Sequence, residues 1–507
     1  MPDRTATRHT PSGLNSPPGP DRLPPQTAAE WAEHGPPARS GAESAGKLRA
    51  RATTAKLEDA GAGAAVPALT AGLQRMSTYR IEGGAPLRGS ITASGAKNAA
   101  TKQIVASLLT DEEVILHNVP RIGDVNITMD IVRSLGAKVE WSGDSTLHIQ
   151  AATVGSGEVP VAFSGLNRIP VLLIGPLLHR YGTASVPLLG GDDIGARPLN
   201  FHVQTLQKLG ATITFEPDCW RATASRLKGA LIDLPYPSVG ATESALLSSV
   251  LAEGTTVIQN AAVEPEIIDT ILLLQKMGAL IAVEVDRTIV VEGVRRLRGA
   301  EHRLLTDRIE VASFAAAAVA TNGDVFIEGA EQGQIMAFLN ALRRVGGEFE
   351  IRPDGIRFFR GNDLRSIALE TDVHPGFATD WQQPFVVLLT QATGLSVIHE
   401  TVFEQRFGYT GVLQEMGATI ELYKTCLGGK TCRYRYGDHP HSCLVQGPTP
   451  LHGTTMQIPD LRAGFSYVIA ALVGKGASSI DGAQYVERGY SHIPEKIEQL
   501  GGRCLVV

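Results

Sequence analysis

DIVRSLGAKVEW, at residues 130–141, joins the end of an apolar helix to a glycine and a short alternating strand, and its central phrase decides the fold. The glycine suits the left-handed conformation that ends many helices, because it has no Cβ to clash. The same phrase returns five more times along the chain. Its six copies are Leu135-Gly136-Ala137, Leu209-Gly210-Ala211, Met277-Gly278-Ala279, Val345-Gly346-Gly347, Met416-Gly417-Ala418 and Leu500-Gly501-Gly502.

The spacing of these glycines gives the size of the repeated unit. Successive glycines are 74, 68, 68, 71 and 84 residues apart, whereas solenoid repeats have periods of about 20–50 residues. A unit of this length fits a small α+β module, and in the first module we expect Asp124 to cap the helix. One core rarely serves more than about 250–300 residues. We therefore predict an α+β protein of six modules in two lobes.

Composition excludes several classes of function. The formal net charge of −6 and the pI near 6.1 do not fit a protein that binds nucleic acid through a basic surface. No apolar run reaches the ~18–20 residues of a membrane span. Five cysteines in 507 residues indicate a reducing compartment rather than a disulfide scaffold. We expect a cytoplasmic protein without nucleic-acid or membrane partners.

Residues 1–77 differ in composition from the rest of the chain. The first 75 residues hold ten of the 29 prolines and bury too little apolar surface to offset the entropy of ordering. We therefore predict a disordered tail. Met76 lies just before the first predicted strand, at 79–82, so we expect that translation can begin there. Peptides from residues 1–75 in native protein would contradict this expectation.

Three loops that lead into predicted helices carry charged residues. SGAKNAA at 94–100 places Lys97 at a helix N-terminus, where its charge adds to the partial positive charge of the free amides and suits an anion. GGDDIGARP at 190–198 combines three glycines with two acids, and PGFATD at 375–380 places Asp380 before an apolar helix. Taken singly, such residues are more often surface groups or helix caps.

Arginines recur in the second half of the chain, at Arg406, Arg462 and Arg488. A guanidinium group binds carboxylate or phosphate in a fork geometry that lysine cannot reproduce. The phrases that combine in one order along the chain are SGAKNAA (94–100), GGDDIGARP (190–198), SVGAT (238–242), LAEGTTVIQNAAVEPEIIDT (251–270), TDRIE (306–310), ETVFEQRF (400–407), DLRAG (460–464) and ERGY (487–490). In this combination, residues 78–507 closely resemble the UDP-N-acetylglucosamine 1-carboxyvinyltransferase family of enolpyruvyl transferases.

The resemblance implies a fold that agrees with the repeat count, an inside-out α/β barrel of six βαβαββ modules in two lobes. The chain would cross twice between the lobes, so that lobe 1 spans 97–305 and lobe 2 combines 78–96 with 306–507. Lobe 1 would carry the nucleotide side and a mobile loop at 188–198. The long last step of the repeat predicts an insertion at 425–443 in lobe 2.

The resemblance also implies the chemistry. Enzymes of this family transfer the enolpyruvyl group of phosphoenolpyruvate to a sugar hydroxyl and release phosphate, in the synthesis of peptidoglycan precursors. C3 of the enol is protonated while the hydroxyl attacks C2, and C3 later loses a proton as phosphate leaves. The site needs an acid, a base and cations that hold phosphate and carboxylate. No cofactor is implied.

Each candidate residue takes its role from the match to the family. Asp192, Asp380, Lys97 and Arg462 are the predicted catalytic residues, with Asp380 as the base for the acceptor hydroxyl. The phosphate-side cations are Lys97, Arg197 and Arg488, and those near the carboxylate are Arg406 and Arg462. Asn98, Asp380 and Val402 match positions around the acceptor sugar, and Ser238, Val239 and Gly240 with Arg197 and His202 match the cradle for the nucleotide diphosphate. The complete set of predicted substrate-binding residues is Lys97, Asn98, Arg168, Arg197, Pro198, His202, Ser238, Val239, Gly240, Thr379, Asp380, Val402, Arg406, Arg462 and Arg488.

Three residues depart from the family pattern. Asp192 stands where most members have a cysteine. A carboxyl group still exchanges protons but is not the thiolate that fosfomycin alkylates, so we predict insensitivity to this antibiotic. Asn200 replaces an Asp that helps to hold the uridine, and Tyr236 replaces a Lys near the nucleotide. UDP-N-acetylglucosamine is the predicted acceptor, and the alternative is a paralogue that enolpyruvylates another uridine nucleotide, such as UMP in nucleoside-antibiotic synthesis.

The predicted insertion holds Cys426, Cys432, His439, His441 and Cys443, which are side chains of the types that bind zinc. It contains no CxxC pair, and its spacing differs from that of compact zinc ribbons. We therefore predict a reduced surface loop without a metal. Metal analysis of the purified protein tests this prediction.

Other classes of protein fit the sequence less well. A non-catalytic paralogue would have lost cations that bind phosphoenolpyruvate, yet all five matched ones are present in the sequence. RNA-processing cyclases share a related module, but the acidic charge and the motifs at 94–100 and 190–198 do not fit them. The sibling enzyme that acts on shikimate 3-phosphate would lack the nucleotide phrases.

Overall fold

The computed structural model describes residues 77–190, 199–429, 432–458 and 461–507. The predicted tail therefore lies outside the described residues, and so do Asp192, Arg197 and Pro198 in the loop that was predicted to be mobile. Within the described parts of the chain the strands form six sheets of three or four strands each.

The six glycine phrases end helices and precede strands, as the sequence predicts. Their central glycines have φ values of 106°, 96°, 102°, 107°, 105° and 79°, in chain order, which favour glycine because a Cβ is strained there. The helices before them are α3 (Gly123–Ser134), α5 (Asn200–Lys208), α7 (Pro265–Lys276), α9 (Met336–Val345), α11 (Thr410–Glu415) and α14 (Ile493–Gln499). The strands after them are β4 (Lys138–Ser142), β7 (Thr212–Phe215), β11 (Leu280–Val283), β15 (Gly347–Arg352), β19 (Thr419–Tyr423) and β23 (Arg503–Val506).

The N-cap prediction in the first module was wrong. Helix α3 begins at Gly123 with Ile122 as its N-cap, so Asp124 lies inside the first turn. The Asp124 carboxylate instead accepts hydrogen bonds from a distant arginine, Arg488. Local capping rules predict that Asp124 caps the helix, but its carboxylate forms a long-range ion pair instead.

A second set of helices is more deeply buried than the first. Its members in the first half of the chain are α2 (Lys97–Ala106), α4 (Pro170–Tyr181) and α6 (Val239–Ser249), and those in the second half are α8 (Arg308–Ala320), α10 (Gln382–Leu389) and α12 (Leu461–Val473). Helix α4 contacts both α2 and α6, while α8, α10 and α12 contact one another. Every residue of α8 is buried, as expected for a helix that is apolar on nearly all sides.

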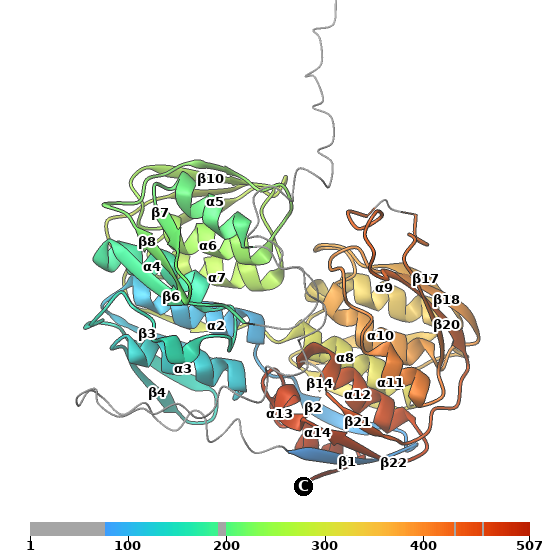
Figure 1. The fold of residues 1–507 in the computed structure, drawn as a ribbon. Helices are drawn as coiled ribbons and strands as arrows, with labels where there is room; N and C mark the ends of the chain where they lie inside the picture. Colours follow the sequence, from blue (N-terminus) through green and yellow to red (C-terminus); the bar gives the residue numbers. More distant parts are fainter. Residues whose placement is uncertain (1–76, 191–198, 430–431, 459–460) are drawn as a thin grey trace, which may run out of the picture. The chain divides into compact units, whose positions relative to one another are not determined.

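These helices lie within two hydrophobic cores (Figure 1). The first core draws its residues from Ala96 to Leu304, and the second core draws them from Tyr79 to Ala93 and from Ile309 to Cys504. The remaining strands around the first core are β3 (Glu113–His117), β5 (Thr146–Gln150), β6 (Thr183–Pro187), β8 (Cys219–Thr223), β9 (Leu231–Asp233), β10 (Thr255–Gln259), β12 (Ile289–Glu292) and β13 (Ala300–Arg303). Those around the second core are β1 (Thr78–Gly83), β2 (Arg88–Thr92), β14 (Asp324–Glu328), β16 (Gly355–Arg360), β17 (Ala368–Glu370), β18 (Gly394–His399), β20 (Ser442–Gly447), β21 (Thr455–Gln457) and β22 (Gly476–Asp481).

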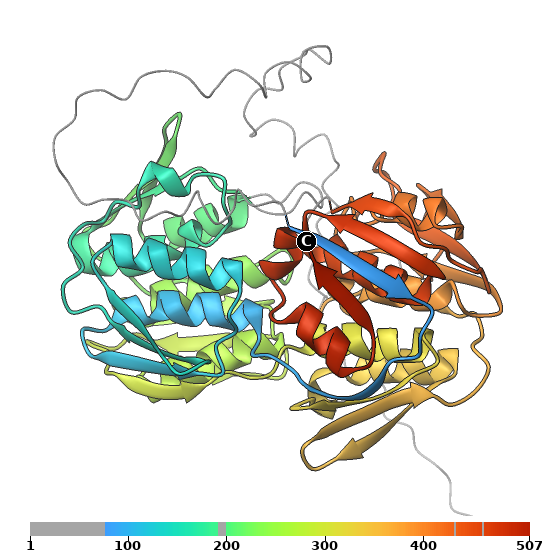
Figure 2. The ribbon, with the colours of Figure 1, turned by 90° about the horizontal axis from the view of Figure 1, so that it is seen from below.

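The first strand of the fold joins the last ones. Strand β1 runs antiparallel to both β22 and β23, so that Tyr79 is opposite Ile480 on one side and Val506 on the other. Figure 2 shows this blue strand between red ones. Strand β2 pairs in parallel with β14. The beginning of the described chain therefore completes the second core.

The chain passes from one core to the other at two neighbouring connections. Gly95 in the first connection forms a bridge with Thr306 in the second. A Cβ on Gly95 would lie 1.6 Å from the carbonyl oxygen of Asn118, so only glycine lets the first connection pass this close. The two connections are thus fixed against each other directly before α2 and α8.

One hairpin is much longer than its counterparts. Residues 143–145 join β4 to β5 and residues 353–354 join β15 to β16, but the connection from β19 to β20 runs over 424–441. This long connection is called the insertion below. Cys443, which the sequence grouped with it, belongs to β20.

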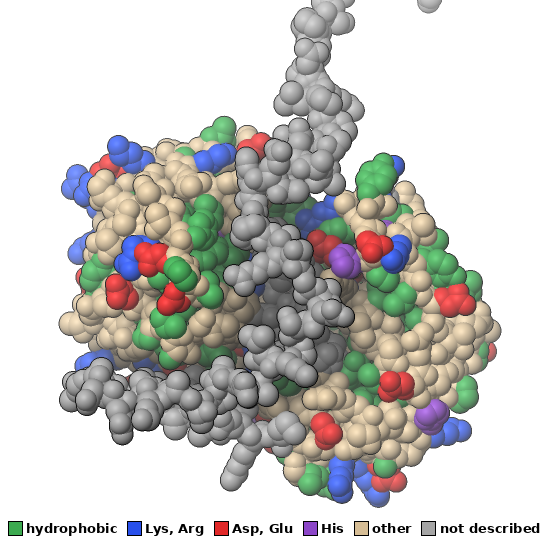
Figure 3. Space-filling model, in the orientation of Figure 1, with side chains coloured by type: hydrophobic (Ala, Val, Ile, Leu, Met, Phe, Trp, Pro, Cys, Tyr) green, Lys and Arg blue, Asp and Glu red, His purple; other side chains and the backbone are tan. Residues whose placement is uncertain are grey.

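None of the helices in the described ranges has the length and apolar character that crossing a bilayer requires. On the face shown in Figure 3, Lys and Arg side chains are interspersed with Asp and Glu side chains among the described residues.

Candidate active site

The candidate residues lie mostly at the N-termini of the buried helices. Lys97 and Asn98 open α2, Arg168 lies two residues before α4, Ser238 caps α6 with Val239 and Gly240 in its first turn, and Thr379 and Asp380 lie in the short helix η4 (Thr379–Trp381) just before α10. Arg462 is the second residue of α12, and its side chain lies outside the described set. Free amides and the helix dipole make such ends favourable for anions.

Lys97 is held between an acid and an aromatic ring. Its Nζ lies 2.6 Å from Oδ2 of Asp307 and 4.1 Å from the centroid of the Tyr490 ring. Burial by itself lowers the pKa of Lys97, but the Asp307 carboxylate and its neighbours outweigh burial and raise the pKa above its usual value. The Asp307 carboxylate therefore favours the charged ammonium form of Lys97.

Asp307 also has a structural role that explains its place. It is the N-cap of α8, and its Oδ1 accepts hydrogen bonds from the amides of Ile309 at 2.8 Å and Glu310 at 3.3 Å. We did not single out Asp307 from the sequence. The signal was present, because an acid followed three residues later by Glu before an apolar run is a capping pattern.

Arg488 reaches from the end of α13 (Ala483–Glu487) to the first core. Its Nη2 donates to Oδ1 of Asp124 at 2.8 Å and to the carbonyl oxygen of Leu166 at 3.1 Å. Arg488 is two residues from Tyr490, whose ring contacts Lys97. The segment 488–490 thus supplies both Arg488 and the ring that contacts Lys97.

A buried polar network fixes the connection in front of Lys97. Lys496 donates to the Ser94 hydroxyl at 2.8 Å and forms an ion pair with Glu310. The Ser94 and Ser491 hydroxyls lie 2.8 Å apart. Residues from three distant parts of the sequence therefore hold the entry to α2, and local sequence patterns do not reveal them.

Arg406 is the most buried of the candidate cations that the structure describes. Its Nη2 donates to Oδ1 of Asp380 at 2.8 Å and to the carbonyl oxygen of Thr379 at 3.1 Å. Its Nε and Nη1 are buried and have no hydrogen-bond partner among the described residues. Because an unpaired buried donor is costly, these two groups point to acceptors outside the described residues, such as the oxygens of a bound anion.

Glu400 organises the loop that carries Arg406. Its Oε2 accepts from the Thr379 hydroxyl at 2.9 Å, and its Oε1 accepts from the amides of Val402 at 2.8 Å and Phe403 at 3.1 Å. Burial raises the pKa of Glu400, while Arg406 and these hydrogen bonds oppose the rise. Glu400 was not a candidate from the sequence, although it opens the ETVFEQRF phrase.

The predicted nucleotide cradle is held by a buried pair. Nδ1 of His202 lies 2.7 Å from the Ser244 hydroxyl. A Cβ on Gly240 would lie 2.9 Å from Cε1 of His202, so glycine lets α6 approach the ring. His202 is thereby placed beside the turn that Ser238 opens, where the Ser238 hydroxyl accepts from the amide of Ala241 at 3.4 Å.

The insertion contributes a cation beside Tyr236. The Arg433 guanidinium lies 3.9 Å from the centroid of the Tyr236 ring and donates to the carbonyl oxygen of Val402. Burial raises the pKa of Tyr236 to about 12, against the lowering effect of Arg433. A positive charge therefore stands beside Tyr236, where the family resemblance implies a Lys. Sequence reasoning missed Arg433 because nothing in the spacing links residues 236 and 433.

The other candidates lie in the part of the chain that forms the first core. Asn98 and Arg168 are half-buried, and burial lowers the pKa of Arg168. Asn200 begins α5, and its Oδ1 is buried without a partner among the described residues.

A cavity of about 510 Å³ lies elsewhere. Its lining includes Asp269, Arg303, Thr306, Glu331 and His374 but none of the predicted site residues. Burial lowers the pKa of His374 to about 4, and Arg308 adds to this effect. The cavity is therefore beside the second connection rather than at the candidate site.

Comparisons with known proteins show the family of the chain. A family model described as EPSP synthase (3-phosphoshikimate 1-carboxyvinyltransferase) matches residues 81–497. A UDP-N-acetylglucosamine 1-carboxyvinyltransferase of Protochlamydia amoebophila is 49% identical over 440 residues, which are 85% of this chain and 95% of that protein. The protein of the same name from Chlamydia muridarum is 50% identical over 436 residues, 85% of this chain and 98% of that protein.

Solved structures share the fold. The enolpyruvyl transferase NikO from Streptomyces tendae superimposes with a TM-score of 0.76 at 24% identity and covers 85% of this chain and 99% of that chain. EPSP synthase from Acinetobacter baumannii gives a TM-score of 0.63 at 18% identity, over 85% of this chain and 100% of that chain. These likenesses confirm the predicted fold class.

Proposed function

The chain belongs to the EPSP synthase family of enolpyruvyl (1-carboxyvinyl) transferases, and we propose that it transfers the enolpyruvyl group of phosphoenolpyruvate to a hydroxyl of UDP-N-acetylglucosamine. The reaction releases phosphate and belongs to peptidoglycan precursor synthesis in the cytoplasm. Its partners are these small molecules, without nucleic acid. The two cores correspond in this proposal to lobes 97–305 and 78–96 plus 306–507.

The hydrogen bonding of Arg406 is the observation that supports the proposal. Two of its nitrogens are buried without partners among the described residues, while the third bonds Asp380. A carboxylate of phosphoenolpyruvate would accept a hydrogen bond from this guanidinium. Arg462, on α12, is the second cation for this carboxylate.

The opposite end of phosphoenolpyruvate needs cations for its phosphate. Lys97 and Arg488 supply them from the N-terminus of α2 and from the end of α13, and Arg197 completes the set. Such fixed charges stabilise the phosphate as the C2–O bond to it breaks. Their pairing with Asp307 and Asp124 keeps them in place before the substrate arrives.

Proton transfer is assigned to two carboxyl groups. Asp380 accepts the proton of the acceptor hydroxyl as that oxygen attacks C2, and Asp192 is the candidate donor to C3. In the second step C3 returns a proton and phosphate leaves, so that the enol double bond forms again. Because Asp192 is not a thiol, the protein is insensitive to fosfomycin in this proposal.

Sequence identity to known proteins favours UDP-N-acetylglucosamine as the acceptor. Proteins named for UDP-N-acetylglucosamine are about half identical to this chain, whereas the NikO enzyme shares 24% of its residues. Arg433 beside Tyr236 supports a nucleotide on this side, because it supplies the cation that the Tyr236 replacement removed. UMP is therefore the less favoured acceptor.

Phosphate release tests the proposal. The full chain is incubated with phosphoenolpyruvate and either UDP-N-acetylglucosamine or UMP, and mass spectrometry identifies the product. We expect phosphate release and an enolpyruvyl product with UDP-N-acetylglucosamine. Turnover with UMP alone would replace this acceptor, and the absence of turnover with both would refute the proposal.

A further inference from the structure

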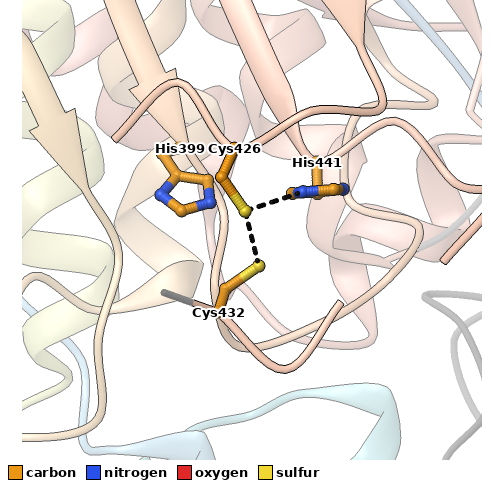
Figure 4. A group of neighbouring side chains, drawn as sticks. All are labelled: His399, Cys426, Cys432 and His441. Carbon is orange, nitrogen blue, oxygen red and sulfur yellow. Dashed lines mark hydrogen bonds between the residues drawn. The ribbon is translucent and has the colours of Figure 1, made fainter. Parts of the chain in front are cut away.

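Four side chains of types that bind metals lie close together where the insertion meets strands β18 and β20 (Figure 4). They are His399 at the end of β18, Cys426 and Cys432 in the insertion, and His441 directly before β20. Their ligand atoms all lie within 4.8 Å of one another. Sγ of Cys426 lies 3.4 Å from Sγ of Cys432 and 3.4 Å from Nε2 of His441.

These distances match a tetrahedral ion. Zinc binds cysteine sulfur at about 2.3 Å and histidine nitrogen at about 2.0–2.1 Å, which places the ligand atoms of a tetrahedral site about 3.3–3.8 Å apart. The two measured 3.4 Å separations lie in this range. Two thiolates and two imidazoles are also a ligand set that suits zinc in structural sites.

Both histidines have the outer partners that metal-bound histidines show. Nδ1 of His399 lies 3.4 Å from Oε2 of Glu370, and Nδ1 of His441 lies 3.0 Å from the carbonyl oxygen of His439. A carboxylate or a backbone carbonyl on one ring nitrogen fixes the tautomer that leaves the other nitrogen for the metal. In each ring that other nitrogen is Nε2.

The Nε2 of His399 gives independent evidence of a missing ligand. His399 is fully buried, and its Nε2 has no hydrogen-bond partner among the described residues. An imidazole nitrogen left unpaired in a protein interior is costly, and a metal ion would satisfy it.

The turn between the two cysteines is shaped to fit this arrangement. A Cβ on Gly428 would lie 2.3 Å from Nδ1 of His399 and 2.6 Å from Cδ of Glu370, so any other residue would displace them. The amide of Gly429 donates to Oε1 of Glu370 at 2.6 Å. The chain after Cys426 therefore packs directly on the carboxylate that orients His399.

We propose that His399, Cys426, Cys432 and His441 bind one zinc ion that fixes the insertion to the sheet of β18 and β20. This proposal differs from the sequence prediction of a loop without a metal in two respects. The fourth ligand, His399, comes from a strand outside the insertion. His439 contributes its carbonyl oxygen as an outer partner, and Cys443 is buried within β20.

The site also has a consequence for the neighbouring residues. Cys432 is followed directly by Arg433 and Tyr434, and both side chains donate to the carbonyl oxygen of Val402. The zinc ion would therefore hold Arg433 over Tyr236. This second step rests on the proposed function, whereas the metal site itself does not.

Metal content of the full-length protein tests the site. Protein purified without chelators, or reconstituted with zinc under reducing conditions, is measured by elemental analysis. We expect about one zinc per chain, and a cobalt-substituted sample with the visible bands of tetrahedral cobalt and of thiolate-to-cobalt charge transfer. Because these measurements use the wild-type chain, they do not depend on whether a variant folds.

Matched variants locate the ion. Cys432→Ser and His441→Gln remove ligands, and Glu370→Gln removes an outer partner and should weaken zinc binding about 10–100-fold. His439→Gln and Cys219→Ser are the controls, and we expect them to retain zinc. Zinc below a tenth of an equivalent after reconstitution, a native disulfide between Cys426 and Cys432, or equal loss in the control variants would overturn the site.

The consequence for Arg433 has its own readout. Zinc removal or Cys432→Ser should raise the KM for the acceptor nucleotide about tenfold, in line with the loss of one cation interaction, and leave the KM for phosphoenolpyruvate nearly unchanged. An unchanged acceptor KM in a zinc-free protein would remove this step but leave the metal site in place.

Discussion

The Lys97 ammonium group lies 2.6 Å from the Asp307 carboxylate, which at the same time caps helix α8. Asp307 thus links α2, the first helix of the first core, to α8, the first helix of the second core. Its two oxygens divide the tasks, since Oδ1 accepts from backbone amides and Oδ2 accepts from Lys97.

The charge of Asp307 can be separated from its capping role. In Asp307→Asn the cap is retained, because Asn caps helices about as well as Asp. Burial lowers the pKa of Lys97 and Asp307 raises it, so the variant should lose the protonated Lys97 at lower pH. We expect the alkaline limb of kcat/KM to move down by about one pH unit or more. The pH profile is measured beside Asp130→Asn, whose carboxylate pairs with Arg133 on α3, and an unmoved limb would contradict the role of the pair.

Arg406→Lys tests the donor geometry of Arg406 at the proposed carboxylate site. Lysine keeps the charge but cannot reproduce the planar arrangement of guanidinium donors, so we expect kcat/KM for phosphoenolpyruvate to fall about 10²–10³-fold, in the range found when one stabilising donor is removed. Arg435→Lys is the matched control in the insertion, where the Arg435 guanidinium stacks on Tyr436. Equal effects of the two substitutions would assign Arg406 no special part in binding.

Fosfomycin tests the residue at position 192. We expect intact-mass analysis of the wild-type protein to show no adduct in the 188–198 loop, because a carboxylate is not the thiolate that the epoxide alkylates. Asp192→Cys should gain one covalent adduct and lose activity with time. An adduct on the wild-type loop, or none on the active cysteine variant, would show that residue 192 does not decide the response.

The sequence predicted the parts of the fold that depend on local chemistry. Gly136 and its five counterparts could be found because a left-handed helix end demands glycine at a fixed place. Asp124 was misassigned because its carboxylate serves a distant partner, Arg488. A local rule cannot weigh a contact that only the folded chain creates.

The same distinction holds for the candidate site. Motifs predicted its charged residues at helix N-termini, such as Lys97 and Asp380. They did not predict the residues that hold these side chains in place, since Glu400 is a single buried acid and Tyr490 is nearly 400 positions from Lys97. His399 was missed for the same reason, because it joins Cys426 only through the pairing of β18 with β20.

Glu243 provides a test of stability against pH. It is buried on α6, 3.8 Å from Nζ of Lys102, and burial raises its pKa from 4.5 to about 7 despite this lysine. The folded protein therefore keeps a proton that the unfolded chain releases between these two pH values, and stability falls as pH rises through this window. Between pH 5.5 and 8, Glu243→Gln should gain about 2 kcal/mol of unfolding free energy relative to wild type. Denaturant unfolding measures it, with Glu253→Gln as the exposed control, and parallel curves for Glu243→Gln and wild type would contradict the prediction.

The position of strand β1 between β22 and β23 determines when the second core can fold during synthesis on the ribosome. The amide of Thr78 donates to the carbonyl oxygen of Val507, so β1 can pair fully only after β23 has been synthesised. The part of the chain up to residue 304 holds all the members of its own core and is free to fold during translation. We expect stalled nascent chains to become protease-resistant in two stages, the second only after residue 507 has left the ribosome. Removal of β23 would therefore damage the start of the fold as much as its end.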